Sequence, residues 1–199
     1  GSGILIPDNN NNNNSNQGSA NAFTDVNEND WFYASVTDAV AKGLFTGVTE
    51  NTFEPNGQMT RAMLVTVLWR MENSPVTAQS SFTDVTAGQW YAQAVSWAAN
   101  NGIVTGVEEG IFAPDQAVTR EQLATIVKRF ADYKGTNLGE TTAEVAFADS
   151  DLIADYAKES VQTMQKAGIL SGREDGTFDP QGTATRAECA KILTMLLNR

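Results

Sequence analysis

Hydrophobic residues recur along the chain with the spacing of amphipathic helices, in three copies. The first helix of each copy has apolar residues at i, i+3 and i+4, the pattern of a helix with one buried face. These positions are Val36, Ala39, Val40 and Leu44, then Val95, Ala98, Ala99 and Ile103, then Val161, Met164, Gln165 and Ile169. The third series keeps the spacing but is polar at one point, Gln165.

A second helix is predicted in each copy, with apolar residues at i, i+3, i+4 and i+7. The stripes are Leu64, Val67, Leu68 and Met71, then Leu123, Ile126, Val127 and Phe130, then Cys189, Ile192, Leu193 and Leu196. The preceding threonines are good N-cap residues: Thr60, Thr119 and Thr185. Gln122 and Glu188 are predicted to complete capping boxes, whereas Met63 is predicted to lose the reciprocal bond. Cys189 is predicted to be a small buried hydrophobe.

The three copies stay in register from an opening aromatic residue to a closing arginine. The aromatic residues are Trp31, Trp90 and Tyr156, and the arginines are Arg61, Arg120 and Arg186. Between them stand glycines at two positions, first Gly43, Gly102 and Gly168, then Gly47, Gly106 and Gly172. The first set is placed to end a helix in the left-handed conformation. Repetition of this kind fixes the architecture, and it implies that three related surfaces share one function.

We therefore predict a mainly α-helical fold built from three helix-loop-helix repeats. The repeats span 23–76, 82–134 and 147–199 and form one integrated domain. Three units are few for an open stack, and closure buries the end faces, so we expect a pseudo-threefold ring. Residues 1–22 are rich in asparagine and are predicted to be a flexible linker, which suggests a C-terminal module of a longer protein.

Composition excludes several classes of function. The net charge is −11, which argues against binding to nucleic acid or to anionic lipid. No apolar stretch approaches the ~18 residues of a membrane span. Histidine is absent, so catalysis by a nucleophile and a histidine is excluded, and the commonest metal ligand is missing. We predict neither catalytic residues, nor a metal site, nor a cofactor.

The three arginines are the main candidates for binding. Each follows an N-cap threonine, so it lies in the first helical turn, where the helix dipole disfavours a cation. Unpaired N–H groups at a helix start together with a guanidinium would make an anion site. The alternative is a structural ion pair with a nearby carboxylate. The candidate carboxylates are Asp25, Asp84, Asp149, Glu54 and Asp179.

Other repeated positions also have two interpretations. Trp31, Trp90 and Tyr156 are either core residues at a helix start or aromatic faces for stacking on sugar rings. Gly47, Gly106 and Gly172 either permit a turn or let the backbone approach a ligand closely.

These motifs together resemble the S-layer homology repeat of bacterial cell-surface proteins. The carrying segments are Phe-x-Asp near the start of each copy and, in the third copy, GREDGTFDPQGTATRAE. The resemblance covers residues 23 to 199. It implies a ring of three repeats with ligand grooves between them. It also implies noncovalent attachment of an exported protein to the cell wall, usually through a secondary polysaccharide that carries pyruvate ketals.

The resemblance assigns ligand contacts to three sets of residues. The motif arginines are Arg61, Arg120 and Arg186, the aromatic residues are Trp31, Trp90 and Tyr156, and the early aspartates are Asp25, Asp84 and Asp149. Tyr156 replaces tryptophan after a one-residue insertion, which weakens the prediction for its groove, and Met63 and Gln122 replace the motif glutamate. Three unequal sites are therefore expected.

We predict a non-catalytic module that anchors an extracellular protein to the wall or S-layer of a Gram-positive bacterium. Its expected partner is an anionic wall polysaccharide, without nucleic acid or membrane insertion. The alternative is a protein–protein module through which neighbouring surface-layer subunits assemble.

Overall fold

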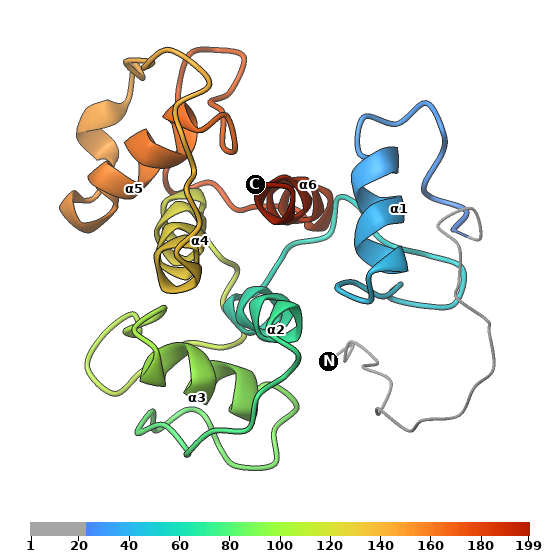
Figure 1. Cartoon of the computed structure of the whole chain (residues 1–199), viewed down its shortest axis with the longest axis vertical. Helices are drawn as coiled ribbons and strands as arrows, with labels where there is room; N and C mark the ends of the chain where they lie inside the picture. The colour runs from blue at the N-terminus through green and yellow to red at the C-terminus, as the bar shows by residue number, and fades with distance from the viewer. Residues whose placement is uncertain (1–22) are drawn as a thin grey trace.

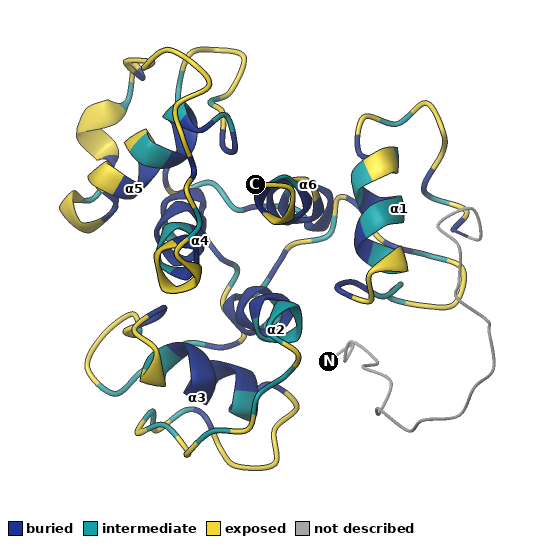
Figure 2. Cartoon of the chain, viewed as in Figure 1, coloured by how far each residue is buried: buried dark blue, intermediate teal, exposed yellow. Residues whose placement is uncertain are grey.

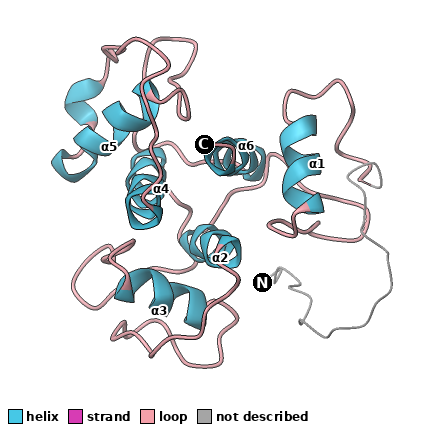
Figure 3. Cartoon of the chain, in the orientation of Figure 1, coloured by secondary structure: helices cyan, strands magenta, loops and turns pink. Residues whose placement is uncertain are grey.

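The computed structural model describes residues 23–199. The predicted Asn-rich linker lies outside this part of the chain. The described part contains six α-helices and one 3-10 turn, η2 (Ser150–Leu152). The helices are α1 (Tyr33–Ala41), α2 (Arg61–Met71), α3 (Ala92–Asn100), α4 (Arg120–Lys134), α5 (Asp155–Lys166) and α6 (Arg186–Leu197). Loops make up much of each repeat, as Figure 3 shows, and no strand is assigned within residues 23–199.

The helices form two layers, with α2, α4 and α6 at the centre and α1, α3 and α5 outside them (Figure 1). Each central helix packs mainly on the outer helix of the following repeat. Thus α2 contacts α3, α4 contacts α5, and the C-terminal helix α6 contacts the first helix, α1. The mainly helical fold of three repeats is confirmed, and the contact between α6 and α1 closes the chain into a ring.

Backbone hydrogen bonds close the ring at the centre as well. Met59, Val118 and Ala184 lie at the same position of the three repeats. The Val118 N–H donates to the Met59 carbonyl at 2.9 Å, and the Ala184 N–H donates to the Val118 carbonyl at 3.3 Å. The Met59 N–H donates to the Ala184 carbonyl at 3.1 Å, which completes the circle. Each repeat therefore depends on both of the others for backbone pairing.

The core follows the predicted apolar stripes, and the central helices are buried along most of their length (Figure 2). Leu64, Leu123 and Leu193 have no exposed surface. The polar position Gln165 is also buried, but the amide is satisfied by the linker before the third repeat. The Gln165 Nε2 donates to the Ala143 carbonyl at 2.8 Å, and Oε1 accepts from the Val145 N–H at 3.0 Å. The longer linker of this repeat thus explains the polar substitution.

The early aspartates hold the loop that precedes each central helix. Each carboxylate accepts two backbone N–H groups, one from the loop phenylalanine and one from the next residue, at 2.7–3.0 Å. The aspartates are Asp25, Asp84 and Asp149, and the phenylalanines are Phe53, Phe112 and Phe178. The residue after the phenylalanine has a positive φ of 55–59° in all three repeats. A charged acceptor thus fixes a backbone conformation that non-glycine residues rarely adopt.

Substitution of Asp149 by alanine should destabilise the whole ring. It leaves two backbone N–H groups without their acceptor, so we expect a loss of about 2–4 kcal/mol in the free energy of unfolding. The measurement is urea denaturation followed by circular dichroism. The matched control is Asp38→Ala, which removes an exposed ion pair with Lys42 and should cost less than about 0.5 kcal/mol. Equal losses in the two variants would contradict the role given to Asp149.

Candidate functional site

The N–H groups at the starts of the central helices are occupied by neighbouring repeats. The Arg61 N–H donates to the Gln116 carbonyl at 2.9 Å, and the Ala62 N–H donates to the Pro114 carbonyl at 3.0 Å. The same pair of bonds recurs at the starts of α4 and α6. The third N–H of each helix donates to the N-cap threonine hydroxyl. The expectation of unpaired N–H groups for an anion is therefore wrong, because ring closure uses them.

The motif arginines are buried and bonded to backbone carbonyls. Arg61, Arg120 and Arg186 are only 4–5% exposed, and each Nε donates at 2.8–2.9 Å to the loop phenylalanine of the next repeat. Each guanidinium also lies over that phenylalanine ring, 4.6–4.9 Å from its centroid. Burial lowers the pKa of all three, but an arginine remains charged. The arginines do have structural partners, but these are mainly carbonyls. Among the described residues, none of the three forms an ion pair with a predicted carboxylate, and the one ion pair present joins Arg120 to Glu188.

The remaining guanidinium N–H groups distinguish the three arginines. The Arg120 Nη2 donates to the Ser171 carbonyl at 2.6 Å, and the Arg186 Nη2 donates to the Thr46 carbonyl at 2.7 Å. Among the described residues, Arg61 has no corresponding second carbonyl and no ion pair. The Arg61 guanidinium therefore keeps donors for another partner.

The aromatic residues at the starts of the outer helices are exposed. Trp31 is 59% exposed, Tyr156 is 53% exposed and Trp90 is 38% exposed. The interpretation as core residues is wrong, because it is the following residue, Phe32 or Tyr91, that is buried in the first two repeats. Trp90 shares a hollow with Arg186, and Tyr156 shares one with Arg61. The ring therefore places each of these two beside an arginine from another repeat.

The hollow beside α2, here called the α2 groove, is almost filled by side chains. Its lining includes Arg186, Trp90 and Arg70, and its cavity is only about 20 Å³. Arg70 is held at its wall, because Nη1 donates to the Leu44 carbonyl at 3.1 Å. That volume suffices for about one water molecule and is too small for a sugar ring.

The hollow beside α4, here called the α4 groove, is open and built by all three repeats. Arg61 comes from the first repeat, Gly106 and Arg129 come from the second, and Tyr156 comes from the third. The cavity is about 320 Å³, at the lower end of the range for small-molecule sites. The sequence analysis expected a weaker site at the groove that contains Tyr156, but this α4 groove has a larger cavity than the α2 groove.

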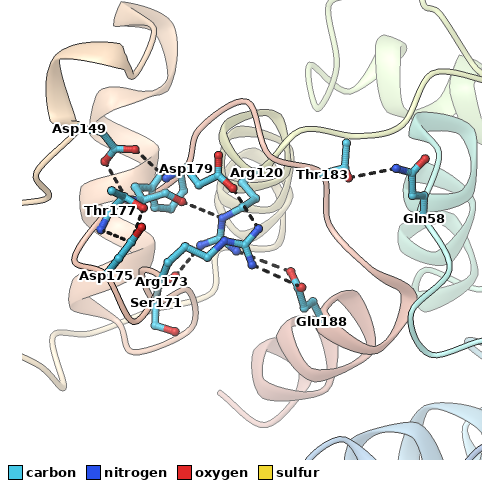
Figure 4. Close-up of polar contacts among 11 residues, drawn as sticks. Gln58, Arg120, Asp149, Ser171, Arg173, Asp175, Thr177, Asp179, Thr183 and Glu188 are labelled. Carbon is cyan, nitrogen blue, oxygen red and sulfur yellow. Dashed lines mark hydrogen bonds and ion pairs between the residues drawn. The ribbon is translucent and has the colours of Figure 1, made fainter.

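The corresponding position beside α6, here called the α6 site, holds a carboxylate of the protein itself. Glu188 Oε2 lies 3.6 Å from Arg120 Nη1, and Glu188 Oε1 lies 3.8 Å from Arg173 Nη1 (Figure 4). Trp31 is also engaged, since the Lys191 ammonium lies 5.6 Å from its ring centroid. Arg120 therefore already faces an anion at the α6 site.

The capping boxes of the first and third repeats differ from the sequence prediction. The Thr60 N–H donates to the Met63 sulfur at 3.3 Å, so the first repeat keeps a reciprocal bond through a weak acceptor. Gln122 completes its box as predicted. Glu188, the best capping residue by type, leaves its box, and its carboxylate lies beside the two arginines instead. Glu188 is placed there by packing that the local motif does not encode.

The second set of repeated glycines provides room for the Phe-x-Asp phenylalanine. A Cβ on Gly47, Gly106 or Gly172 would lie 2.5–2.9 Å from the ring of Phe23, Phe82 or Phe147. These glycines and the aspartates therefore have structural reasons for their identity. Any contact that they make with a ligand stays a prediction, although Gly106 also lines the α4 groove.

Other chemistry is limited in the described part of the chain. Cys189 is fully buried as predicted, and burial raises the pKa of its thiol. Within residues 23–199, no cluster of three carboxylate, cysteine or histidine side chains could hold a metal ion. None of the helices described there has the length and apolar character needed to span a bilayer.

The repeats coincide with a known family model. The model of the S-layer homology domain matches residues 22–62, 81–124 and 146–190. The chain belongs to the S-layer homology family.

Similar proteins carry this domain as a small part of a longer chain. The chain is 34% identical to an amylopullulanase of Thermoanaerobacterium thermosulfurigenes over 89% of its own length and 10% of the relative. An S-layer protein of Bacillus thuringiensis subsp. finitimus is 29% identical over 86% of this chain and 21% of the relative. A cellulosome-anchoring protein of Acetivibrio thermocellus is 27% identical over 77% of this chain and 35% of the relative.

Sequence reasoning missed Arg70 and Arg129, because neither belongs to the quoted motif. It also passed over Arg173, which lies inside the quoted segment of the third copy but has valine at the same position of the other two copies. One signal was present in the repeats. Arg70 and Arg129 stand at the same position of their central helices, nine residues after the motif arginine, where the third repeat has Met195. This position would have been found by also asking at which positions the three repeats differ.

Lysine in place of Arg186 should destabilise the ring although it keeps the charge. Lysine has no counterpart of the Nε donor that bonds the Phe53 carbonyl, and it lacks the planar group over the ring. We expect a loss of about 2–3 kcal/mol in the free energy of unfolding, measured by urea denaturation. Arg129→Lys is the control and should leave stability within about 0.5 kcal/mol. A stable Arg186→Lys variant would contradict the structural role.

The Cys189 thiol should be unreactive in the folded protein. A buried thiol with a raised pKa has little thiolate at pH 8, and a reagent cannot reach it. We expect a colorimetric thiol reagent to label less than a few per cent of the native protein in an hour, and all of it in 6 M guanidinium, following. Rapid labelling of the native protein would show that α6 opens readily.

Proposed function

We propose that this chain is a non-catalytic module that anchors an exported protein to the bacterial cell wall by binding an anionic polysaccharide. The α4 groove is its principal site. The observation that carries the proposal is an open cavity of about 320 Å³ where two arginines and an exposed tyrosine meet. Such a site suits a sugar ring with a carboxylate, such as a pyruvate ketal.

The chemistry of the groove supports an acidic sugar over a neutral one. Tyr156 offers an exposed aromatic face, and burial of its phenol together with the nearby Glu121 raises its pKa. The phenol therefore stays neutral at physiological pH and does not repel an anion. A guanidinium binds a carboxylate through two parallel hydrogen bonds. The net charge of −11 makes these local cations necessary for holding an acidic polymer.

The similar proteins support a place at the cell surface. One is called an S-layer protein and one a cellulosome-anchoring protein, and both share most of this chain's length. An amylopullulanase shares the same segment over only a tenth of its chain, which is consistent with a module used by proteins of different activity.

The α4 groove can be tested by removal of its aromatic face. Tyr156→Ala should weaken retention on purified pyruvylated wall polysaccharide roughly tenfold, equivalent to about 1.4 kcal/mol. The reason is that the half-exposed ring contributes contact area to the groove and little to the core. The measurement is a sedimentation assay with a titrated amount of polymer.

The matched control is Trp31→Ala, which removes the aromatic residue at the equivalent position of the first repeat, beside Lys191 of α6. Because the α6 site already contains Glu188, retention should change less than twofold. Removal of the pyruvyl groups from the polymer should abolish binding by the wild-type protein. Retention that is independent of pyruvyl groups and of Tyr156 would reject the proposal. Light scattering that detects assembly without any polymer would favour a self-association module instead.

A further inference from the structure

We infer that Arg129 is the residue that grips the acid group in the α4 groove, and that the motif arginine Arg61 serves mainly as a structural residue there. This inference rests on the proposed function and names the recognition element of the same site. Arg129 lies outside the repeated motif, in the middle of α4, and it lines the cavity together with Gln122, Thr125 and Ile126. These four residues are spaced along one face of the helix.

The two arginines of the groove differ in what they already bind. Arg61 is buried, its Nε is bonded to the Phe112 carbonyl, and its guanidinium lies 4.7 Å from the Phe112 ring centroid. Arg129 is only partly buried, and its guanidinium makes no hydrogen bond or ion pair with any described residue. Its complete set of guanidinium donors is therefore available to a ligand. Arg61 can add at most the N–H groups that the carbonyl leaves over.

The same helix position separates the three repeats. Arg70, the counterpart in α2, donates to the Leu44 carbonyl, and burial lowers its pKa. Met195, the counterpart in α6, has no charge. Of the three equivalent positions, that of Arg129 alone combines a guanidinium without a protein partner and a cavity large enough for a sugar.

No carboxylate is among the described residues that line the α4 groove. Two guanidinium groups line one cavity, and like charges in a partly buried site repel each other. The carboxylate of Glu121 lies next to the groove, where it acts on the Tyr156 phenol, and it accepts from the Ala154 N–H at 2.9 Å and from the Gln181 amide at 2.6 Å. At the α6 site the corresponding arginine is faced by Glu188. A ligand carboxylate in the α4 groove would supply the charge that Glu188 supplies there.

The experiment measures binding of a small probe rather than of the polymer. The probe is a methyl hexoside with a 4,6-linked pyruvate ketal, and its methyl ester is the uncharged control. Affinity is determined by titration calorimetry on the full chain at two salt concentrations. Arg129→Gln should weaken binding of the acid at least roughly tenfold, the effect of losing a charged hydrogen-bonded pair. Arg129→Lys should recover only part of it, because lysine cannot bind in the two-pronged way.

The control variant is Lys128→Gln, which removes the same charge from the adjacent residue. Lys128 pairs with Asp132 and lines a different hollow, so its loss should change affinity less than twofold. Unchanged affinity in Arg129→Gln, with the wild type binding the acid, would overturn the assignment of Arg129. Equal weakening in Arg129→Gln and Lys128→Gln would overturn it as well, because a diffuse charge effect would then suffice. If the wild type binds neither probe nor pyruvylated polymer, the proposed function fails instead.

Discussion

The fold depends on one phenylalanine in each repeat that is held from both sides. Its N–H is bound by an aspartate of the same repeat, and its carbonyl accepts from the arginine of the preceding repeat, whose guanidinium covers its ring. Because the third arginine, Arg186, reaches back to Phe53 in the first repeat, the contacts form a closed cycle. Loops that have few helical hydrogen bonds of their own are thereby fixed, and no repeat contains a complete set of partners by itself.

This cycle binds, within the protein, the groups that the motif alone would predict to be available to a ligand. The helix-start N–H groups bind carbonyls of the next repeat, and Arg120 and Arg186 each use at least two donors on carbonyls. What remains for recognition is then set by residues that differ among the repeats. Arg129, Tyr156 and Glu188 belong to this group, and they decide which grooves are open and which are already filled.

Inequality among the grooves follows from small local substitutions on a common frame. A second arginine bonded to Leu44 narrows the α2 groove, and a glutamate beside two arginines occupies the α6 site. In the α4 groove the equivalent of that glutamate is Gln122, which stays in its capping box, so Arg61 has no ion pair within residues 23–199 like the one between Arg120 and Glu188. The number of open grooves can thus change without any change of fold.

The sequence by itself determined the helices, their apolar faces, the N-cap threonines, the left-handed glycines after the outer helices and the number of repeats, because these depend on residues close together in the chain. Only the tertiary structure decided the partners. Each central helix packs on the outer helix of the next repeat. The motif arginines bond to carbonyls more than 50 residues away in the chain. The Glu188 carboxylate lies beside Arg120 and Arg173 and does not complete its capping box. These choices depend on how three units meet around a ring, and no spacing within one unit carries that information.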